Sequence, residues 1–271
     1  MTPPLIMGIV NVTPDSFSDG GRHDTANAAI AHAVNLVADG TDWLDIGGES
    51  TRPGAAPVSA DDEIARTLPV IVALASRLPD IPISIDTMKP QVARAAISAG
   101  ARMWNDVTAG RFAPEALDVA AELDCELCLM HMQGEPRTMQ AAPHYDDVVA
   151  EVIAFLKARV EAAIEAGVAR TKIWIDPGIG FGKTLDHNLA LIQCTQRIIE
   201  ETGCPLLFGA SRKRFIAAID EKASHASDRL AGSLVVAMEA SHQGAGIIRV
   251  HDVRETVQAL KVAAALDELK D

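Results

Sequence analysis

Short aliphatic runs alternate along the chain with longer stretches that repeat at the helical period. The runs cover eight stretches, at residues 5–10, 43–46, 82–85, 102–104, 126–130, 172–175, 205–208 and 246–250. Several of them are apolar at successive positions, which is typical of strands covered on both faces. Helical spacing is clearest after His144, with apolar side chains at Val149, Val152, Ile153, Leu156, Val160 and Ile164. The pattern therefore predicts eight short strands, each followed by a helix.

Proline and glycine stand at the expected starts and ends of the predicted helices. Pro90 stands at an expected first helical position, and glycines at expected helix ends are Gly40, Gly100, Gly167 and Gly203. Eight strand–helix units of about 34 residues each fill the chain without a linker or low-complexity tract. This repeat predicts one domain, 1–271, folded as a (β/α)8 TIM barrel with its active site at the C-terminal ends of the strands. A doubly wound open sheet is the alternative, because the same alternation fits both folds.

Composition and charge limit the classes of partner that the chain is expected to bind. The 271 residues are 48% hydrophobic and 23% charged, which is enough apolar material for a sizeable core. Only 4% are aromatic, so we expect an aliphatic core. Lysine and arginine number 24 against 37 acidic residues, and the net charge of −13 disfavours nucleic acid and anionic membranes as partners. Without a signal-like start or a long apolar stretch, the chain is expected to be cytoplasmic.

Cys125 and Cys128 form a Cys-x-x-Cys pattern, which occurs in redox centres and in halves of zinc sites. They fall in or beside a predicted strand, where residues three apart face opposite sides. No second pattern of this kind is present in the sequence. We therefore expect buried thiols rather than a redox or zinc centre.

Polar residues stand where each predicted strand ends. In chain order they are Asn11, Asp45, Asp86, Asn105, His131, Asp176, Ser211 and His251. Any one of them has a structural explanation, because Asp and Asn cap helices and form turns. Core packing does not require the whole set, and in a barrel these strand ends build the active site. The set therefore favours a polar pocket for a small molecule over a structural scaffold.

The glycine-rich segment 176–184 invites comparison with nucleotide-binding loops. A P-loop needs glycine five positions before Gly-Lys-Thr, and that position is Pro177. A dinucleotide fingerprint starting at Gly178 needs glycine at a position held by Lys183. Both assignments fail. What remains is a strand that ends in Asp176 and a loop whose backbone a flat ligand can approach.

Two basic groups follow the seventh and eighth predicted strands. Ser211-Arg-Lys-Arg214 opens a predicted helix, where positive charge opposes the helix dipole unless an anion is bound. Arg249 and His251 are two residues apart on the last strand and share a face. Loops after these two barrel strands frequently bind phosphate. The sequence therefore favours a phosphate site over a solvated helix start.

The loops after the first two predicted strands, 13–21 and 47–54, are rich in Gly, Pro, Ser and Asp. Such composition is typical of exposed turns. The loops also carry charged and aromatic side chains at the expected barrel rim, namely Asp15, Phe17, Glu49 and Arg52. We therefore expect both loops to fold over a bound ligand.

Motifs at nearly every strand end resemble the dihydropteroate synthase family. They are Asn11-Val-Thr-Pro-Asp-Ser-Phe-Ser-Asp-Gly-Gly21, Gly48-Glu-Ser-Thr-Arg-Pro-Gly54, Ser84-Ile-Asp-Thr87, Asn105-Asp-Val107, Met130-His-Met-Gln133, Pro136-Arg-Thr-Met-Gln140, Asp176-Pro-Gly-Ile-Gly-Phe-Gly-Lys183, Ser211-Arg-Lys213 and Arg249-Val-His-Asp252. The resemblance implies a TIM-barrel transferase of folate biosynthesis that uses Mg2+ and acts as a homodimer. Such an enzyme joins 4-aminobenzoate to 6-hydroxymethyl-7,8-dihydropterin diphosphate, giving 7,8-dihydropteroate and diphosphate.

The resemblance also implies roles for individual residues. The residues that match the pterin pocket are Asp86, Asn105, Asp176 and Lys213, with Phe181 beside them. Asn11 matches a magnesium ligand, and Thr51 a substrate-binding threonine. Arg249 and His251 match diphosphate contacts, while Ser211 and Phe17 match the surroundings of the aminobenzoate site. The expected catalytic residues are Asp86, Asp176, Lys213, Asp15 and Arg52.

The chemistry suits these residue types. The edge of a 2-amino-4-oxopteridine presents hydrogen-bond donors, which a buried carboxylate binds well. Loss of diphosphate leaves positive charge on the pterin methylene, and Asp86 and Asp176 would stabilise that charge. The arylamine nucleophile is neutral, so no strong general base is needed.

Two alternatives stay open. A pterin-binding methyltransferase domain would have no use for Arg249 and His251 together. A catalytically silent pterin-binding paralogue would have lost loop or diphosphate residues that are present here. Two departures from the family pattern concern shape, because Thr108-Ala109-Gly110 replaces Ser-Gly-Gly and Ala217 stands where glycine is common.

Overall fold

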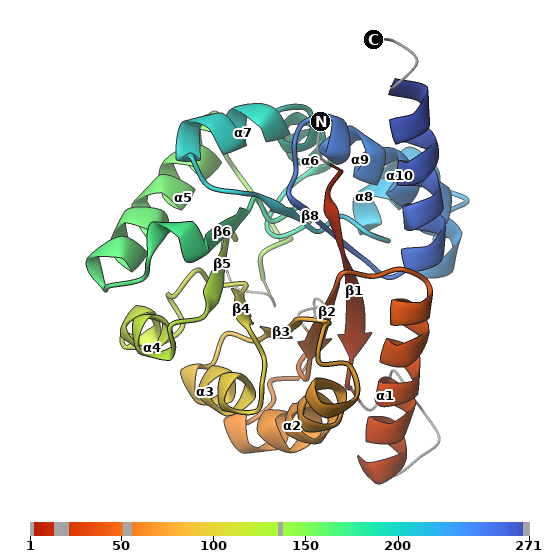
Figure 1. The fold of residues 1–271 in the computed structure, drawn as a ribbon. Helices are drawn as coiled ribbons and strands as arrows, with labels where there is room; N and C mark the ends of the chain where they lie inside the picture. The colour runs from red at the N-terminus through yellow and green to blue at the C-terminus, as the bar shows by residue number, and fades with distance from the viewer. Residues whose placement is uncertain (1–2, 14–21, 51–55, 135–137, 268–271) are drawn as a thin grey trace.

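Eight parallel strands form a barrel, and helices surround it (Figure 1). The computed structural model describes residues 3–13, 22–50, 56–134 and 138–267. The strands are β1 (Leu5–Asn11), β2 (Trp43–Gly47), β3 (Ile83–Asp86), β4 (Met103–Asp106), β5 (Glu126–Met130), β6 (Ile173–Asp176), β7 (Leu207–Phe208) and β8 (Ile247–Val250). They pair in the order β6-β5-β4-β3-β2-β1-β8-β7. A parallel bridge between Ile175 and Leu206 joins β6 to β7 and closes the ring.

The predicted (β/α)8 barrel is therefore confirmed, and the open sheet is wrong, because the two end strands of the order meet. Each predicted strand coincides with an observed one, and no end differs by more than two residues. The agreement has a physical reason: both faces of a barrel strand are covered, so the strands are nearly continuous apolar runs.

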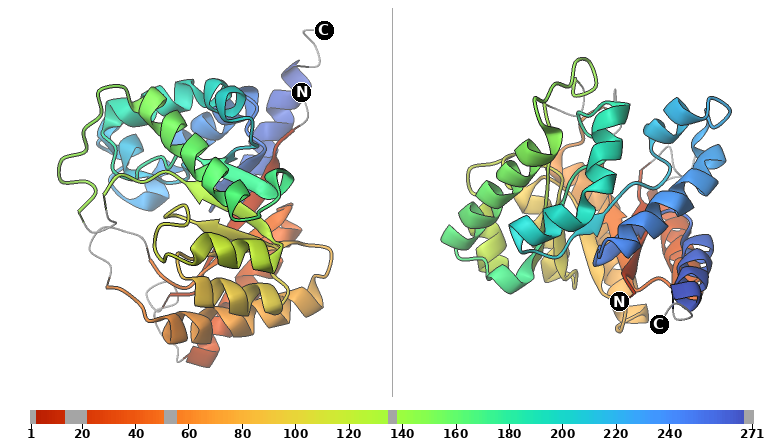
Figure 2. Two further views of the ribbon diagram at one scale, coloured as in Figure 1. Left: turned by 90° about the vertical axis from the view of Figure 1, so that its left-hand side faces the viewer. Right: turned by 90° about the horizontal axis from the view of Figure 1, so that it is seen from above.

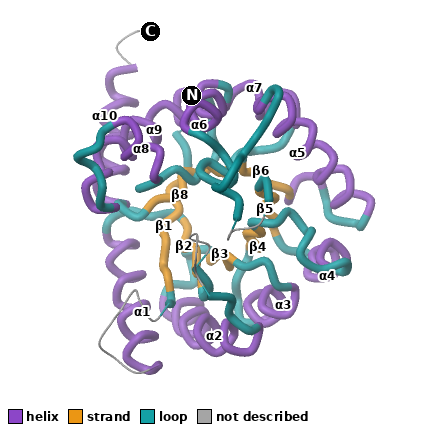
Figure 3. The backbone as a smooth tube through the Cα atoms, turned by 180° about the vertical axis from the view of Figure 1, so that it is seen from behind, coloured by secondary structure: helices purple, strands orange, loops and turns teal. Residues whose placement is uncertain are grey.

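Helices make the outer layer, as Figures 2 and 3 show from other sides. They are α1 (Arg22–Ala38), α2 (Ala60–Arg77), α3 (Pro90–Ser98), α4 (Ala116–Leu123), α5 (Val148–Glu165), α6 (Leu185–Gln193), α7 (Thr195–Thr202), α8 (Arg214–Ile219), α9 (Leu230–His242) and α10 (Val253–Asp267), with short 3-10 turns η2 (Arg170–Lys172) and η3 (Ala226–Arg229). Two helices, rather than the single one expected, lie between β6 and β7 and again between β7 and β8.

Local chemistry explains where several helices begin and end. The Asp147 carboxylate accepts hydrogen bonds from the Val149 and Ala150 N–H groups and so caps α5. Pro90 is the first residue of α3, as predicted. Gly203 closes α7 with a φ of 63°, a left-handed conformation that costs glycine little.

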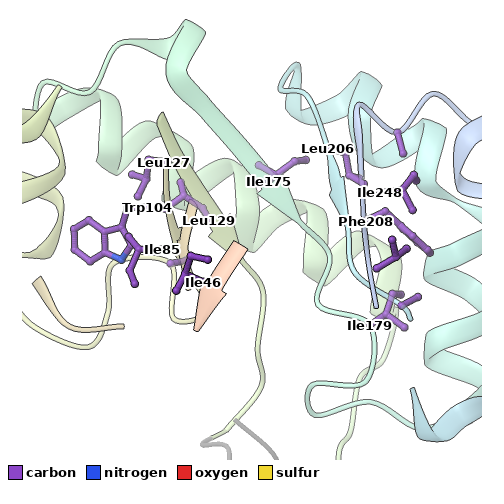
Figure 4. Close-up of a cluster of buried hydrophobic side chains, with 14 of the residues drawn as sticks. Ile46, Ile85, Trp104, Leu127, Leu129, Ile175, Ile179, Leu206, Phe208 and Ile248 are labelled. Atoms are coloured by element: carbon purple, nitrogen blue, oxygen red, sulfur yellow. The ribbon is translucent and has the colours of Figure 1, made fainter. Parts of the chain in front are cut away.

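Two apolar layers lie on opposite sides of the strands. Outward-facing side chains pack against the helices, and Figure 4 labels Ile46, Ile85, Trp104, Leu127, Leu129, Ile175, Ile179, Leu206, Phe208 and Ile248 of this layer. A second cluster fills the barrel interior near the strand starts, and its buried members are Met7, Trp43, Met103, Cys128, Leu207 and Ile247. The barrel is therefore packed at one end, which leaves the C-terminal strand ends for a site.

Cys125 and Cys128 are buried thiols, as predicted. Cys125 packs in the outer layer and Cys128 in the barrel interior, so the two face opposite sides. Both are free, and burial raises the pKa of each thiol. Among the described residues, no helix combines the length and the apolar character needed to cross a membrane.

Candidate active site

Polar residues occupy inward-facing positions near the C-terminal ends of the strands. Asp45 lies beside Ile9 in the strand register, and Asp86 lies beside Asn105. Asp176 is two residues beyond Trp174, whose register partner is Cys128 of the interior cluster. Because side chains alternate along a strand, these polar groups share the barrel interior.

Arg249 joins two of the carboxylates. Its Nε donates to Asp45 Oδ2 at 2.6 Å, and its Nη2 donates to Asp86 Oδ2 at 2.7 Å. Asn105 Nδ2 donates to the same Asp45 oxygen at 3.3 Å. Burial raises the pKa of Asp86 to about 7, although the Arg249 charge acts in the opposite direction. The arrangement holds one cation between two carboxylates that would otherwise repel each other.

Asp176 lies close enough to feel the charge of the Lys213 ammonium group, which in turn contacts the Phe181 ring. Its Oδ1 accepts the Gly178 N–H at 2.6 Å, and burial raises its pKa to about 6. Lys213 Nζ lies 4.1 Å from the centre of the Phe181 ring, which is a cation–π contact. The structure thus brings Asp176, Phe181 and Lys213 together, as the sequence led us to expect.

An apolar wall stands next to these polar groups. It is a separate buried cluster made of Val107, Met130, Met132, Met139 and Phe181. Thioether side chains adapt to aromatic faces, and the neighbouring carboxylates accept hydrogen bonds at a ring edge. The combination fits a flat heterocycle whose rim carries hydrogen-bond donors.

The basic groups of the seventh and eighth strands are less exposed to an anion than the sequence suggested. Arg212 is paired with Asp252 through both Nε and Nη2. Ser211 Oγ lies 3.0 Å from His251 Nδ1, and burial lowers the pKa of His251 to about 3. His251 is therefore a neutral hydrogen-bonding group at pH 7, which corrects the expectation of a positive Arg249–His251 pair.

The Asp106 carboxylate holds the loop after β4, where Ala109 departs from the family pattern. The Asp106 carboxylate accepts the Thr108 N–H at 2.8 Å, the Thr108 hydroxyl at 2.7 Å and the Gly110 N–H at 2.6 Å. Ala109 has a φ of 54°, which explains why glycine is usual there. By strand alternation Asp106 faces away from the barrel interior, and its hydrogen bonds hold the loop.

Four expected site residues lie outside the described residues, namely Asp15, Phe17, Thr51 and Arg52. Asn11 ends β1, and its Oδ1 is 3.7 Å from where a Cβ at position 47 would lie. Glu49, expected at the rim, bonds to other groups of the protein through both carboxylate oxygens. Its Oε2 binds Lys89 Nζ at 2.6 Å, and its Oε1 accepts the Val58 N–H at 2.9 Å.

Three groups gained importance only from the structure. The sequence marks Asp45 only as a polar strand end, although an acidic residue inside an apolar strand requires a buried partner. Glu63 is fully buried and binds Lys89 Nζ at 2.5 Å, and its place on the apolar face of α2 with Thr67 and Val70 was a usable signal. Lys183 is the third, because a lysine that is only 3% exposed needs partners inside the protein.

Comparison with known proteins decides the family. A model of the family "Pterin binding enzyme" matches residues 7–251. The dihydropteroate synthase of Escherichia coli (strain K12) is 47% identical over 273 residues, covering 100% of this chain and 94% of the relative. That of Neisseria meningitidis serogroup B is 48% identical over 267 residues, covering 97% and 93%. The chain belongs to the dihydropteroate synthase family.

Solved dihydropteroate synthases have the same barrel. The Yersinia pestis enzyme with a sulfonamide drug complex superposes with a TM-score of 0.91 at 44% identity, covering 98% of this chain and 95% of that one. The Xanthomonas albilineans enzyme with 4-aminobenzoic acid also gives 0.91, at 49% identity and with 98% and 93% covered. As a dihydropteroate synthase, the chain is a transferase and binds small molecules.

Proposed function

We propose that this chain condenses 6-hydroxymethyl-7,8-dihydropterin diphosphate with 4-aminobenzoate, giving 7,8-dihydropteroate and diphosphate. The names of its relatives support this, as do Xanthomonas albilineans structures with 4-aminobenzoic acid and with 7,8-dihydropteroate. The observation that carries the proposal is the pair of buried carboxylates, Asp86 and Asp176, beside an apolar wall and two cationic side chains.

In this proposal Asp86, Asn105 and Asp176 bind the pterin edge. Each buried carboxylate accepts ring N–H donors without competition from water, so the contacts are charge-assisted and strong. Asn105 offers an amide that both donates and accepts, and Asp45 already holds it in place. The Phe181 ring and the methionine wall pack against the faces of the heterocycle.

The bond changes balance without a strong base. The arylamine nitrogen bonds to the pterin methylene carbon, the bond from that carbon to the diphosphate oxygen breaks, and the diphosphate leaves with the electron pair. The amine then loses a proton to water or diphosphate. Asp86 and Asp176 stabilise the positive charge that develops on the methylene and ring, a charge that is small in the ground state.

The diphosphate is assigned to Arg249 and His251, beside the helix start at Lys213. Arg249 uses Nε and Nη2 for Asp45 and Asp86, so an anion would be bound through its remaining Nη1 donors. His251, neutral at pH 7, contributes a hydrogen bond rather than a charge.

The residues at the mouth of the barrel fit Mg2+ if the diphosphate supplies further ligands to the ion. Among the described residues, no three His, Cys, Asp or Glu side chains are grouped so that they could hold a metal ion. Mg2+ needs few protein ligands and keeps several waters, so the amide oxygen of Asn11 with diphosphate oxygens would suffice. When bound, the ion neutralises the leaving diphosphate. Asn11→Ala should then raise the Mg2+ concentration needed for half-maximal turnover.

We further propose a homodimer that works in the cytoplasm. Helices α8, α9 and α10 carry exposed aliphatic residues, with Ile219 at 62%, Val235 at 66% and Val262 at 57% exposure, and four free cysteines suit a reducing compartment. Sedimentation should show a dimer that Val235→Glu dissociates. Val72→Glu, at an exposed position on α2 (53%), is the matched control.

One assay decides between an enzyme and a silent pterin-binding protein. Purified protein with pterin diphosphate, 4-aminobenzoate and Mg2+ should form 7,8-dihydropteroate, and Asp176→Asn should abolish the reaction. Tight pterin binding without any turnover by the unchanged protein would overturn the proposed activity in favour of the silent paralogue.

A further inference from the structure

Lys183 is a buried lysine behind the candidate site. It is 3% exposed, and its nitrogen lies 3.0 Å from His131 Nδ1, 3.0 Å from the Phe181 carbonyl oxygen and 3.4 Å from the His131 carbonyl oxygen. An ammonium group has three N–H donors, and three acceptors surround this one. No described carboxylate forms a salt bridge with it, so its contacts are made to two backbone segments and one ring.

The loop that contains Lys183 lies directly on the end of β5. A Cβ at Gly178 would come within 1.9 Å of the His131 carbonyl oxygen, and a Cβ at Gly182 within 2.4 Å of the Gln133 carbonyl oxygen. Only glycine permits such an approach. Tyr145 adds a hydrogen bond from its hydroxyl to the Gly182 carbonyl at 2.9 Å. The amine of Lys183 thus lies at the junction between the β5 end and the β6 loop.

The same loop supplies two groups to the site. The Gly178 N–H donates to Asp176 Oδ1 at 2.6 Å, and the Phe181 ring lies under the Lys213 ammonium. Lys183 holds the carbonyl of Phe181 itself, and its nitrogen is 3.4 Å from the position of a Cβ at Gly178. Loss of these contacts would release the segment that carries both groups.

A buried lysine that joins two loops has a high free-energy cost, because its charge loses contact with water. Burial lowers the pKa of Lys183 to about 7, with Asp176 acting against that shift and Lys213 adding to it. Burial likewise lowers the pKa of His131, so its ring is neutral and accepts at Nδ1. Apolar residues of similar volume often replace buried charges without loss of stability, so geometry rather than stability accounts for a lysine here.

We propose that Lys183 is a positioning residue of the pterin pocket. Its amine fixes the Phe181 and His131 carbonyls, so that the β6 loop presents the Gly178 N–H to Asp176 and the Phe181 ring to Lys213. The inference rests on the proposed function, because pterin is the ligand whose binding it concerns.

The test compares Lys183→Met, Phe181→Leu and the double variant with the unchanged protein. Lys157→Met, an exposed lysine on α5, is the matched control. Affinity for 6-hydroxymethylpterin is measured by calorimetry, KM for 4-aminobenzoate is measured separately, and thermal melting monitors the fold. Lys183→Gln, which keeps two donors, is the second variant.

We expect Lys183→Met to weaken pterin binding at least tenfold, with KM for 4-aminobenzoate changed less than threefold. Lys183→Gln should recover part of the affinity. If Lys183 acts through Phe181, the double variant should bind no more weakly than the weaker-binding of the two single variants, because the effects share one path.

Three results would overturn the inference: unchanged pterin affinity in folded Lys183→Met, strictly additive losses in the double variant, or failure of both Lys183 variants to fold, which would make the residue a folding determinant. The proposed function fails separately, when the unchanged protein gives no 7,8-dihydropteroate.

Discussion

At the scale of single residues, Arg249 has two tasks. Its guanidinium binds Asp45 and Asp86 through separate nitrogens, and the side chain is 18% exposed. Burial works against its charge, yet the two carboxylates raise its pKa. Asp45 has a further oxygen, Oδ1, that is buried and has no hydrogen-bond partner among the described residues. The Arg249 guanidinium therefore holds the two carboxylates in place even when no anion is bound.

Arg249→Ala should damage the fold as well as anion binding. It leaves Asp45 and Asp86 facing each other without a cation, which costs about 3 kcal/mol by analogy with other broken buried pairs. Protonation relieves the repulsion, so urea unfolding should show a larger loss at pH 8 than at pH 5. Bare pterin affinity should also fall, because Asp86 loses its anchor; unchanged pterin affinity would show that Asp86 is held by other means.

Asp176→Asn should separate stability from binding. A carboxyl group whose pKa is about 6 in the fold and 3.8 ordinarily holds its proton more tightly when folded. Its stabilising effect is complete below about pH 4 and is lost as the pH rises through about 6. The variant should therefore be more stable than the unchanged protein at pH 8, by a margin that shrinks at pH 5 and vanishes below about pH 4.

Pterin affinity of Asp176→Asn should change in the opposite direction. The amide replaces one acceptor by a donor that faces a ring donor, so calorimetry at pH 8 should show most of the affinity lost. Asp118→Asn on the outer helix α4 serves as the control. Retained pterin affinity would mean that the pterin edge lies elsewhere in the barrel.

At the scale of elements, the β6–α6 loop is defined by how closely it approaches β5. Gly178 and Gly180 both have positive φ, 67° and 83°. The space available for a side chain differs between them. A Cβ at Gly178 would meet the His131 carbonyl at 1.9 Å, whereas one at Gly180 would meet the flexible Lys213 side chain at 3.3 Å.

Gly178→Ala should therefore be much more harmful than Gly180→Ala. Both substitutions carry the same left-handed strain of about 1 kcal/mol, so their difference isolates the backbone collision. We expect Gly178→Ala to lower the free energy of unfolding by at least 2 kcal/mol more, as measured in urea. Equal losses would show that the loop can move away from β5.

Much of this element structure could be predicted from the sequence. The strands are short apolar runs with both faces covered, and that pattern is local. The division of two units into two helices each could not be predicted, because α7 and α8, of eight and six residues, carry little periodicity of their own. The Arg249–Asp45 contact joins residues 204 apart, so nothing local specifies it. Neutral His251 likewise follows from burial, which sequence does not display.

At the scale of the whole molecule, one outer core runs around the barrel beneath the helices. Trp43, Trp104 and Trp174 lie on β2, β4 and β6 and report on different parts of the ring. If residues 1–271 form a single domain, tryptophan fluorescence and circular dichroism should give coincident urea transitions. Separate transitions would divide the chain into two folding units.

The join between β6 and β7 has a consequence for how the ring fluctuates. Ile175 and Leu206 form its bridge, and the Ile175 N–H donates to the Pro205 carbonyl at 3.0 Å, while β1 and β2 pair over five residues. Amide protons along this join should exchange with deuterium sooner than those of β2, since fewer bonds must open. Asp176 follows Ile175 directly, and a Cβ at Gly209 would lie 3.4 Å from its Oδ2. A ligand bound to Asp176 should therefore slow deuterium exchange at the Ile175 amide. Uptake at that amide thus reports whether the site holds a ligand.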